Sequence, residues 1–152
     1  MTAPRILGVD PGVTGGLAFL HSDEIEAHDV PVAAGELNID EILRLIRDAK
    51  PTMAVIESAS SRPGQGVSSV FKFGAAYGAL QTCAIACWVP LHRVTPSVWK
   101  RHFKLSADKE QARALAIRLW PGVGLFTRKR DHGRAEAALI ARYGLEVLCR
   151  RT

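Results

Sequence analysis

The chain has 152 residues, of which 47% are apolar and 23% charged, and its formal net charge is +5. This size and composition suit one globular domain spanning residues 1–152, and they exclude a disordered tail, a collagen-like fibre and a disulfide-stapled miniprotein. No stretch approaches the ~18 consecutive apolar residues of a membrane span, and the N-terminus does not resemble a signal peptide. We therefore expect a cytoplasmic protein that does not bind a membrane.

The three cysteines include no CxxC pair, which indicates reduced thiols. The charge is unevenly distributed along the chain. Residues 1–57 carry 4 Lys and Arg against 10 Asp and Glu, whereas residues 58–152 carry 16 against 5. A basic C-terminal two-thirds favours a polyanionic partner, most simply nucleic acid, although a solvated basic surface would give the same composition.

The first third of the chain has the pattern of short strands joined by tight turns. Three strands are predicted at residues 5–10, 17–20 and 24–31, and short connections of this kind favour an antiparallel meander. A helix follows, with Asn38 or Asp40 as its N-cap, and Pro51 stops it. Residues 53–57 then read as a buried strand that ends at Glu57.

The remainder of the chain is predominantly helical. A polar loop at 58–66 precedes a long small-residue helix at about 67–86, in which Phe71, Ala75, Gly78, Ala79 and Thr82 recur at helical spacing. Later elements are a strand at 88–94, a short helix begun by Thr95-Pro96, a helix capped by Ser106, and a last helix from about His132 to 148. Strands alternating with helices predict an α/β sandwich.

Isolated acids stand at positions where an α/β sheet forms its site. Asp10 and Glu57 each end an apolar strand, and strand ends line the crevice of an open α/β sheet. Glu136 lies in the first turns of the last helix, with His132 four residues earlier on the same face if the helix has begun there. Alternatively, Asp10 accepts bonds from its turn, Glu57 pairs with a basic side chain, and Glu136 and His132 are ordinary first-turn residues.

Taken together, these four side chains predict an oxygen-rich site for a divalent cation. Carboxylates suit Mg²⁺, and an imidazole ligand also suits Mn²⁺. Two such ions about 4 Å apart can clamp the attacking water and the leaving oxygen of a phosphodiester.

Four segments resemble the motifs of RuvC-type Holliday junction resolvases, which belong to the ribonuclease H-like superfamily. The segments are ILGVDPGVTGGLAFL, AVIESASSRPGQGVSSVFKFGAAYGAL, VTPSVWKRHFKLSADKEQARAL and DHGRAEAALIARYGL, which together cover roughly residues 5–148. The resemblance implies a three-layer sandwich whose mixed five-stranded sheet begins with an antiparallel meander. It also implies a homodimer that cuts four-way DNA junctions by paired, symmetric, metal-dependent hydrolysis.

The same resemblance assigns roles to individual residues. Asp10, Glu57, His132 and Glu136 would be the catalytic metal ligands, holding two Mg²⁺ or Mn²⁺ ions, with Asp131 as a competitor for the place of His132. The family's aromatic wedge, which follows the second acid, has no counterpart in residues 58–66, unless Phe71 or Phe73 supplies it. The small-residue helix would contribute to the dimer interface, although packing against the sheet explains the same pattern.

Basic residues flank the proposed site in the sequence and are candidates for contacts with DNA phosphates. They are Arg62, Lys72, Lys100, Arg101, Lys104, Lys109, Arg128, Lys129, Arg130 and Arg134. Two other readings stay open: a YqgF-like RNA-processing nuclease, and a non-catalytic DNA-binding dimer of the same fold. An actin-like ATP-binding fold also carries a turn like that at residues 10–14, but it needs two such domains, so we expect no nucleotide cofactor.

Overall fold

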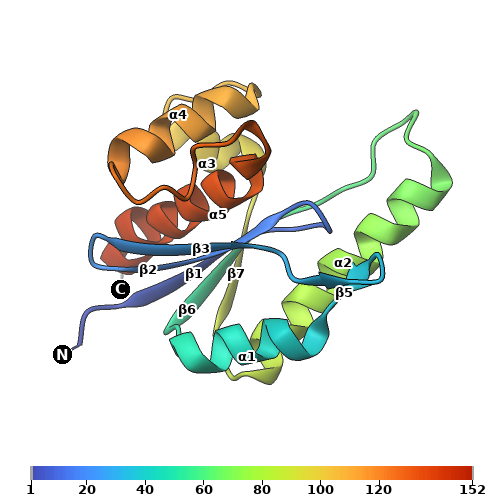
Figure 1. Cartoon of the computed structure of the whole chain (residues 1–152), viewed down its shortest axis with the longest axis horizontal. Coiled ribbons are helices and arrows are strands. Elements are labelled where there is room, and N and C mark those ends of the chain that lie inside the picture. The colour runs from blue at the N-terminus through green and yellow to red at the C-terminus, as the bar shows by residue number, and fades with distance from the viewer. Residues whose placement is uncertain (1, 152) are drawn as a thin grey trace.

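The computed structural model describes residues 2–151, and its centre is a mixed five-stranded sheet with the order β3-β2-β1-β6-β7 (Figure 1). Its strands are β1 (Arg5–Asp10), β2 (Gly16–His21), β3 (Glu24–Asp29), β6 (Met53–Glu57) and β7 (Leu91–Val94). The first three form an antiparallel meander, whereas β6 pairs parallel with both β1 and β7. This arrangement confirms the predicted fold class.

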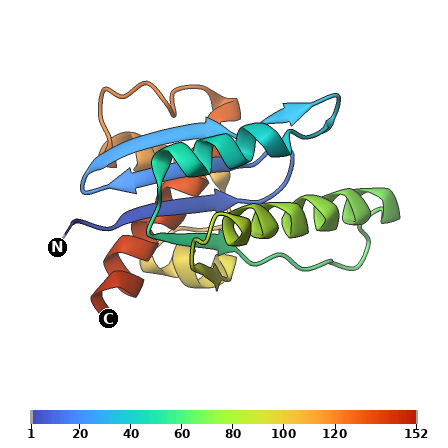
Figure 2. The same cartoon turned by 90° about the horizontal axis from the view of Figure 1, so that it is seen from below.

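Helices cover both faces of the sheet, which gives three layers. They are α1 (Ile39–Ala49), α2 (Val67–Ala86), α3 (Pro96–His102), α4 (Lys109–Leu119) and α5 (His132–Tyr143). Helices α1 and α2 lie on one face, and α3, α4 and α5 lie on the other (Figures 1 and 2). A two-strand hairpin, β4 (Val32–Ala33) and β5 (Glu36–Leu37), precedes α1, and a 3-10 turn (Lys129–Asp131) precedes α5. Among residues 2–151, no helix combines the length and hydropathy needed to cross a membrane.

The central strands are buried on both faces and divide their side chains between two cores. Alternate residues of a strand point to opposite faces. Ile6 of β1 therefore packs into the core beneath α3, α4 and α5, whereas Leu7 and Val9 pack beneath α1 and α2. Strand β6 divides in the same way, with Val55 on the α5 side and Ile56 on the α2 side.

Glycines allow α5 to lie directly on β1 and β2. A Cβ atom added at Gly8 would stand 2.0 Å from the carbonyl oxygen of Ala137, and one added at Gly16 would stand 2.5 Å from that of Gly133. Side chains at these positions would push the helix off the sheet. The close approach brings the first turns of α5, which carry Glu136, over the end of β1, which carries Asp10.

Several predicted boundaries need correction. Asp108, and not Ser106, caps α4, since its side chain accepts from the backbone N–H of Glu110. Strand β7 begins at Leu91, because Trp88 takes a left-handed conformation with φ of 60° at the end of α2. The regular part of the last helix ends at Tyr143 and continues as a π-helix, Gly144–Leu148.

The inward face of α2 is formed by other residues than those singled out at helical spacing in the sequence. Its buried residues are Ala76, Leu80, Cys83 and Ala84. Phe71, by contrast, is 77% exposed. The residues that recur at helical spacing in the sequence therefore leave much of their surface in solvent.

Candidate active site

Three carboxylates meet at one edge of the sheet. Val9 pairs with Ile56 in the parallel register of β1 and β6, so Asp10 and Glu57, the next residue on each strand, end side by side. Glu136 approaches from α5 and is only 6% exposed. The structure therefore brings together the three acids that the sequence singled out.

The electrostatics of these acids reflects their crowding. Burial and the neighbouring carboxylates Glu136 and Glu57 raise the pKa of Asp10 well above its usual value, and a hydrogen bond with Glu136 contributes in the same direction. Burial also raises the pKa of Glu57, with a further contribution from Glu136. Carboxylates that repel each other in a buried setting are stabilised by a proton or a cation.

Two lysines supply positive charge to this cluster. The Lys100 ammonium on α3 lies 3.8 Å from Oε1 of Glu136, and it stands 5.4 Å from the ring centroid of Trp99. The charge of Lys109, at the start of α4, acts to lower the pKa of both Asp10 and Glu57. Two residues predicted to bind DNA thus lie beside the acids.

Two adjoining grooves open at this edge of the sheet. The acid groove, a cavity of about 640 Å³, is lined by Glu57, Arg62, Phe73, Pro96 and Lys109 among others. The basic groove, about 750 Å³, is lined by Arg62, Pro96, Lys100, Arg101 and Lys104 among others. Arg62 and Pro96 line both grooves, so basic side chains border a path that leads to Glu57.

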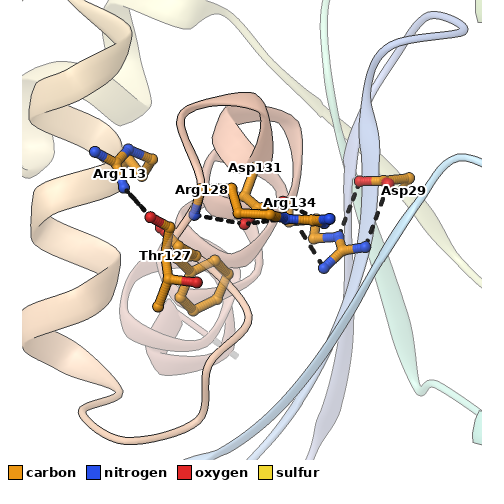
Figure 3. Close-up of polar contacts among 7 residues, drawn as sticks. Asp29, Arg113, Thr127, Arg128, Asp131 and Arg134 are labelled. Atoms are coloured by element: carbon orange, nitrogen blue, oxygen red, sulfur yellow. Dashed lines mark hydrogen bonds and ion pairs between the residues drawn. The ribbon is translucent and has the colours of Figure 1, made fainter.

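Asp131 is held in an ion-pair network away from the three acids. Its side chain is 1% exposed and accepts from the backbone N–H of Arg128 at 2.8 Å and from the Arg128 guanidinium at 2.8 Å. Arg134 lies 3.9 Å from the same carboxylate and donates to Asp29 at the end of β3 at 2.9 Å (Figure 3). The network joins the 3-10 turn to the sheet at the start of α5.

His132 stands in a different setting, although it is the next residue. It is the first residue of α5, which confirms that it lies one helical turn before Glu136. Its Nδ1 is buried and has no hydrogen-bond partner in the part of the chain that the structure describes. Glu110 is one of its electrostatic neighbours, so the imidazole lies on the side of α5 that faces α4.

The predicted DNA-binding residues fall into three groups. Arg62, Lys100, Arg101, Lys104 and Lys109 line the two grooves. Arg128 and Arg134 are engaged by Asp131 and Asp29 (Figure 3). The remaining three, Lys72, Lys129 and Arg130, are exposed on α2 and on the 3-10 turn.

The structure places two aromatic residues at the site, Phe73 and Trp99, to which the sequence assigned no definite position. The Phe73 ring lies against Gly12, whose added Cβ would stand 3.3 Å from Cε2 of that ring, and it lines the acid groove. Trp99 is fully buried, and its indole Nε1 donates to Oε2 of Glu57 at 2.7 Å. No sequence signal distinguishes Trp99 from an ordinary core residue, because its partner lies 42 residues away.

A divalent cation suits the donors at this edge by their chemistry. Three carboxylates in mutual repulsion form the oxygen-rich set that Mg²⁺ and Mn²⁺ prefer. Within residues 2–151, however, no three His, Cys, Asp or Glu side chains are arranged as a metal-binding group. The lysines offset part of the repulsion among the acids, since Lys100 lies 3.8 Å from Glu136 and the charge of Lys109 acts on Asp10 and Glu57.

Comparison with known proteins identifies the fold. The chain is similar to RuvC from T. thermophilus in complex with a Holliday junction substrate, with a TM-score of 0.66, 19% identity, and coverage of 91% of this chain and 90% of that chain. It is also similar to another Thermus thermophilus RuvC structure, with a TM-score of 0.65, 19% identity, and coverage of 92% and 94%. No family model and no curated protein matches the sequence. The likeness confirms the RuvC-like, ribonuclease H-like fold.

Proposed function

We propose that this chain is a structure-specific endonuclease that resolves four-way DNA junctions by paired, metal-dependent phosphodiester hydrolysis. The observation that carries the proposal is the convergence of Asp10, Glu57 and Glu136, the second of which lines a groove shared with basic side chains. The likeness of the fold to a RuvC bound to a Holliday junction supports the choice of substrate.

Asp10, Glu57 and Glu136 would hold Mg²⁺ or Mn²⁺, two ions per site, and His132 would add its imidazole. When bound, such ions activate water and stabilise the leaving oxygen. The elements that carry these carboxylates, β1, β6 and α5, pack together in one core, and this packing would set the relative positions of the three acids. Asp131 is not required as a ligand, since Arg128 and Arg134 already occupy it.

The residues of the grooves would bind and orient the DNA. Arg62, Lys100, Arg101, Lys104 and Lys109 would contact backbone phosphates on the path to the acids. Lys72, Arg128, Lys129, Arg130 and Arg134 would lie farther along the DNA arms. Phe73 offers an aromatic face in the acid groove, where an unpaired base could stack. It is a better candidate than Phe71 for the missing wedge, because Phe71 lines neither groove.

Two symmetric nicks require two active sites, and an exposed stripe along α2 supports a homodimer. Val67, Phe71 and Ile85 are 87%, 77% and 56% exposed and share one face of the helix. Between them lie Gly74 and Gly78, whose added Cβ atoms would meet no atom within 4 Å. A second helix could approach closely at these glycines and cover the apolar side chains.

Cleavage of a synthetic four-way junction tests the proposal. We expect Mg²⁺-dependent cutting of the junction, with little cutting of linear duplex or of an RNA–DNA hybrid. Asp10→Asn should abolish cleavage and retain junction binding, because it removes a charged metal ligand but no phosphate contact. Preferred cutting of RNA would instead favour an RNA-processing nuclease. Unchanged cleavage by Asp10→Asn would refute the site.

A further inference from the structure

The hydrogen bond between Trp99 and Glu57 links α3 to the candidate active site. An indole N–H can only donate, and when buried it usually finds an acceptor. Here the acceptor is a carboxylate, 2.7 Å away and 42 residues distant in sequence. Hydrogen bonds to charged acceptors are the stronger kind, and this one forms where the ring is fully buried.

The packing around Trp99 fixes the direction of that bond. The ring is fully buried in the core that also includes Val94 of β7 and Leu139 and Tyr143 of α5, so its surroundings leave it little freedom to turn. A side chain locked in this way can impose its orientation on a more mobile partner. Glu57 is less enclosed than Trp99, because it lies at the end of β6, is only partly buried and lines the acid groove.

We propose that Trp99 is a positioning residue that anchors Oε2 of Glu57 and thereby presents the other oxygen as a single-oxygen ligand to a divalent cation in the acid groove. The inference rests on the proposed metal-dependent function. It adds a residue that contacts neither cation nor DNA but determines how one ligand is oriented. Partners of this kind commonly change metal affinity by about 10- to 100-fold when removed.

The indole N–H signal of Trp99 in the intact protein gives the first test. The chain has three tryptophans, of which Trp88 is 94% exposed and Trp120 is buried against Phe126. We expect the Trp99 indole signal to be protected from solvent exchange, and to shift both on addition of Mg²⁺ and in Glu57→Ala. A Trp99 signal that responds to neither change would overturn the inference, even if substitutions of Trp99 itself fail to fold.

Metal affinity gives the second test. Trp99→Phe keeps an aromatic ring and removes the donor, so we expect Mn²⁺ to bind about tenfold more weakly by calorimetry. Trp120→Phe is the matched control and should stay within about twofold of wild type. Equal Mn²⁺ affinity in Trp99→Phe and wild type would contradict the positioning role.

The two hypotheses fail separately. Wild-type cleavage of the junction, together with an unchanged Mn²⁺ affinity in Trp99→Phe, would leave the function standing and refute the role of Trp99. Suppose instead that the Trp99 indole signal shifts in Glu57→Ala and on addition of Mg²⁺, but the protein cuts no junction. That result would support the positioning role and refute the proposed junction cleavage.

Discussion

Two adjacent residues, Asp131 and His132, show how burial and partners separate a structural role from a chemical one. Both are polar and both precede Glu136 by about one helical turn. The carboxylate of Asp131 is saturated by the backbone and guanidinium of Arg128, with Arg134 close by (Figure 3). The imidazole of His132 keeps a buried nitrogen without a partner among residues 2–151. Of the two side chains, only His132 therefore keeps a nitrogen that no described protein group already binds.

Substitution of each residue should therefore affect a different property. Asp131→Asn weakens the bonds to Arg128 at a buried position, and we expect it to lower the free energy of unfolding by about 1–3 kcal/mol while Mn²⁺ affinity stays near wild type. His132→Ala should weaken Mn²⁺ binding by tenfold or more and cost little stability. Denaturant unfolding and calorimetry on both variants provide the comparison. Loss of Mn²⁺ binding in Asp131→Asn, with normal binding in His132→Ala, would reverse the assignment.

At this scale the sequence could indicate the three acids but not their surroundings. Asp10 and Glu57 each end an apolar run, and Glu136 lies one helical turn after His132. These local patterns were sufficient to single out the three acids as candidates. The bonds from Trp99 to Glu57 and from Arg134 to Asp29 join residues 42 and 105 positions apart. Contacts over such separations depend on how the elements pack, which one sequence does not show.

At the scale of elements, the ends of helices were predicted best where the sequence carries a clear cap or stop residue. The N-cap of α1 at Asn38 and the span of α2 agree with the structure. The hairpin β4–β5 was missed because two-residue strands carry no periodicity. For α2 the sequence left open whether the small-residue face packs on the sheet or faces a second copy, because a helix that is apolar on most sides does not reveal which side is inward.

Helix α3, which carries Trp99 and Lys100, is tied to the C-terminal π-helix through Glu146. His102 of α3 lies 2.7 Å from Glu146, and Arg142 also donates to that carboxylate. Burial opposes the charge of Glu146, but the bonds from His102 and Arg142 outweigh it, and the pKa of Glu146 is lowered. Since the folded pKa lies below the unfolded value near 4.5, this bond stabilises the fold above that pH and is lost as the pH falls through the folded pKa.

Glu146→Gln should therefore destabilise the protein in a pH-dependent way. We expect a loss of about 1 kcal/mol at pH 7, moderated because the groups are partly exposed, and this difference should be smaller at pH 2, because Glu146 loses its charge as the pH falls through the folded pKa. Urea unfolding at both pH values measures it. Glu36→Gln, at an exposed carboxylate on β5, is the control and should change little. A difference that persists unchanged at low pH would mean that the charge of Glu146 is not what holds the π-helix to α3.

At the scale of the whole molecule, the exposed α2 stripe predicts association of two copies. Phe71→Glu combined with Ile85→Glu would place charges on that stripe, and both positions are exposed, so the fold should tolerate them. We expect light scattering to give twice the 16.5 kDa chain mass for wild type and a single chain mass for the double variant. Val123→Glu, at a residue 44% exposed in a loop, should remain dimeric. A wild-type monomer both with and without junction DNA would refute the dimer.

The uneven charge along the chain becomes a spatial arrangement in the fold. The acids Asp10 and Glu57 come from strands of the acidic first part, whereas the basic residues that line the two grooves all come from the second part. A polyanion would therefore bind to the later segments and present its phosphates to carboxylates supplied largely by the earlier ones. Binding of this kind releases counterions, so its affinity falls steeply with salt concentration.

Removal of three groove lysines should make that dependence shallower. Without divalent metal, we expect Lys100→Ala, Lys104→Ala and Lys109→Ala together to reduce the slope of log affinity against log salt by about 0.9 for each phosphate that a lysine no longer neutralises. A second triple variant, at Arg47, Lys50 and Arg118, removes the same charge from exposed positions that line neither groove. It should lower affinity slightly and leave the slope near wild type, because long-range attraction is screened within about 10 Å at 0.1 M salt. Equal slopes for the two triple variants would show that the DNA does not follow the grooves and that the basic surface acts only through net charge.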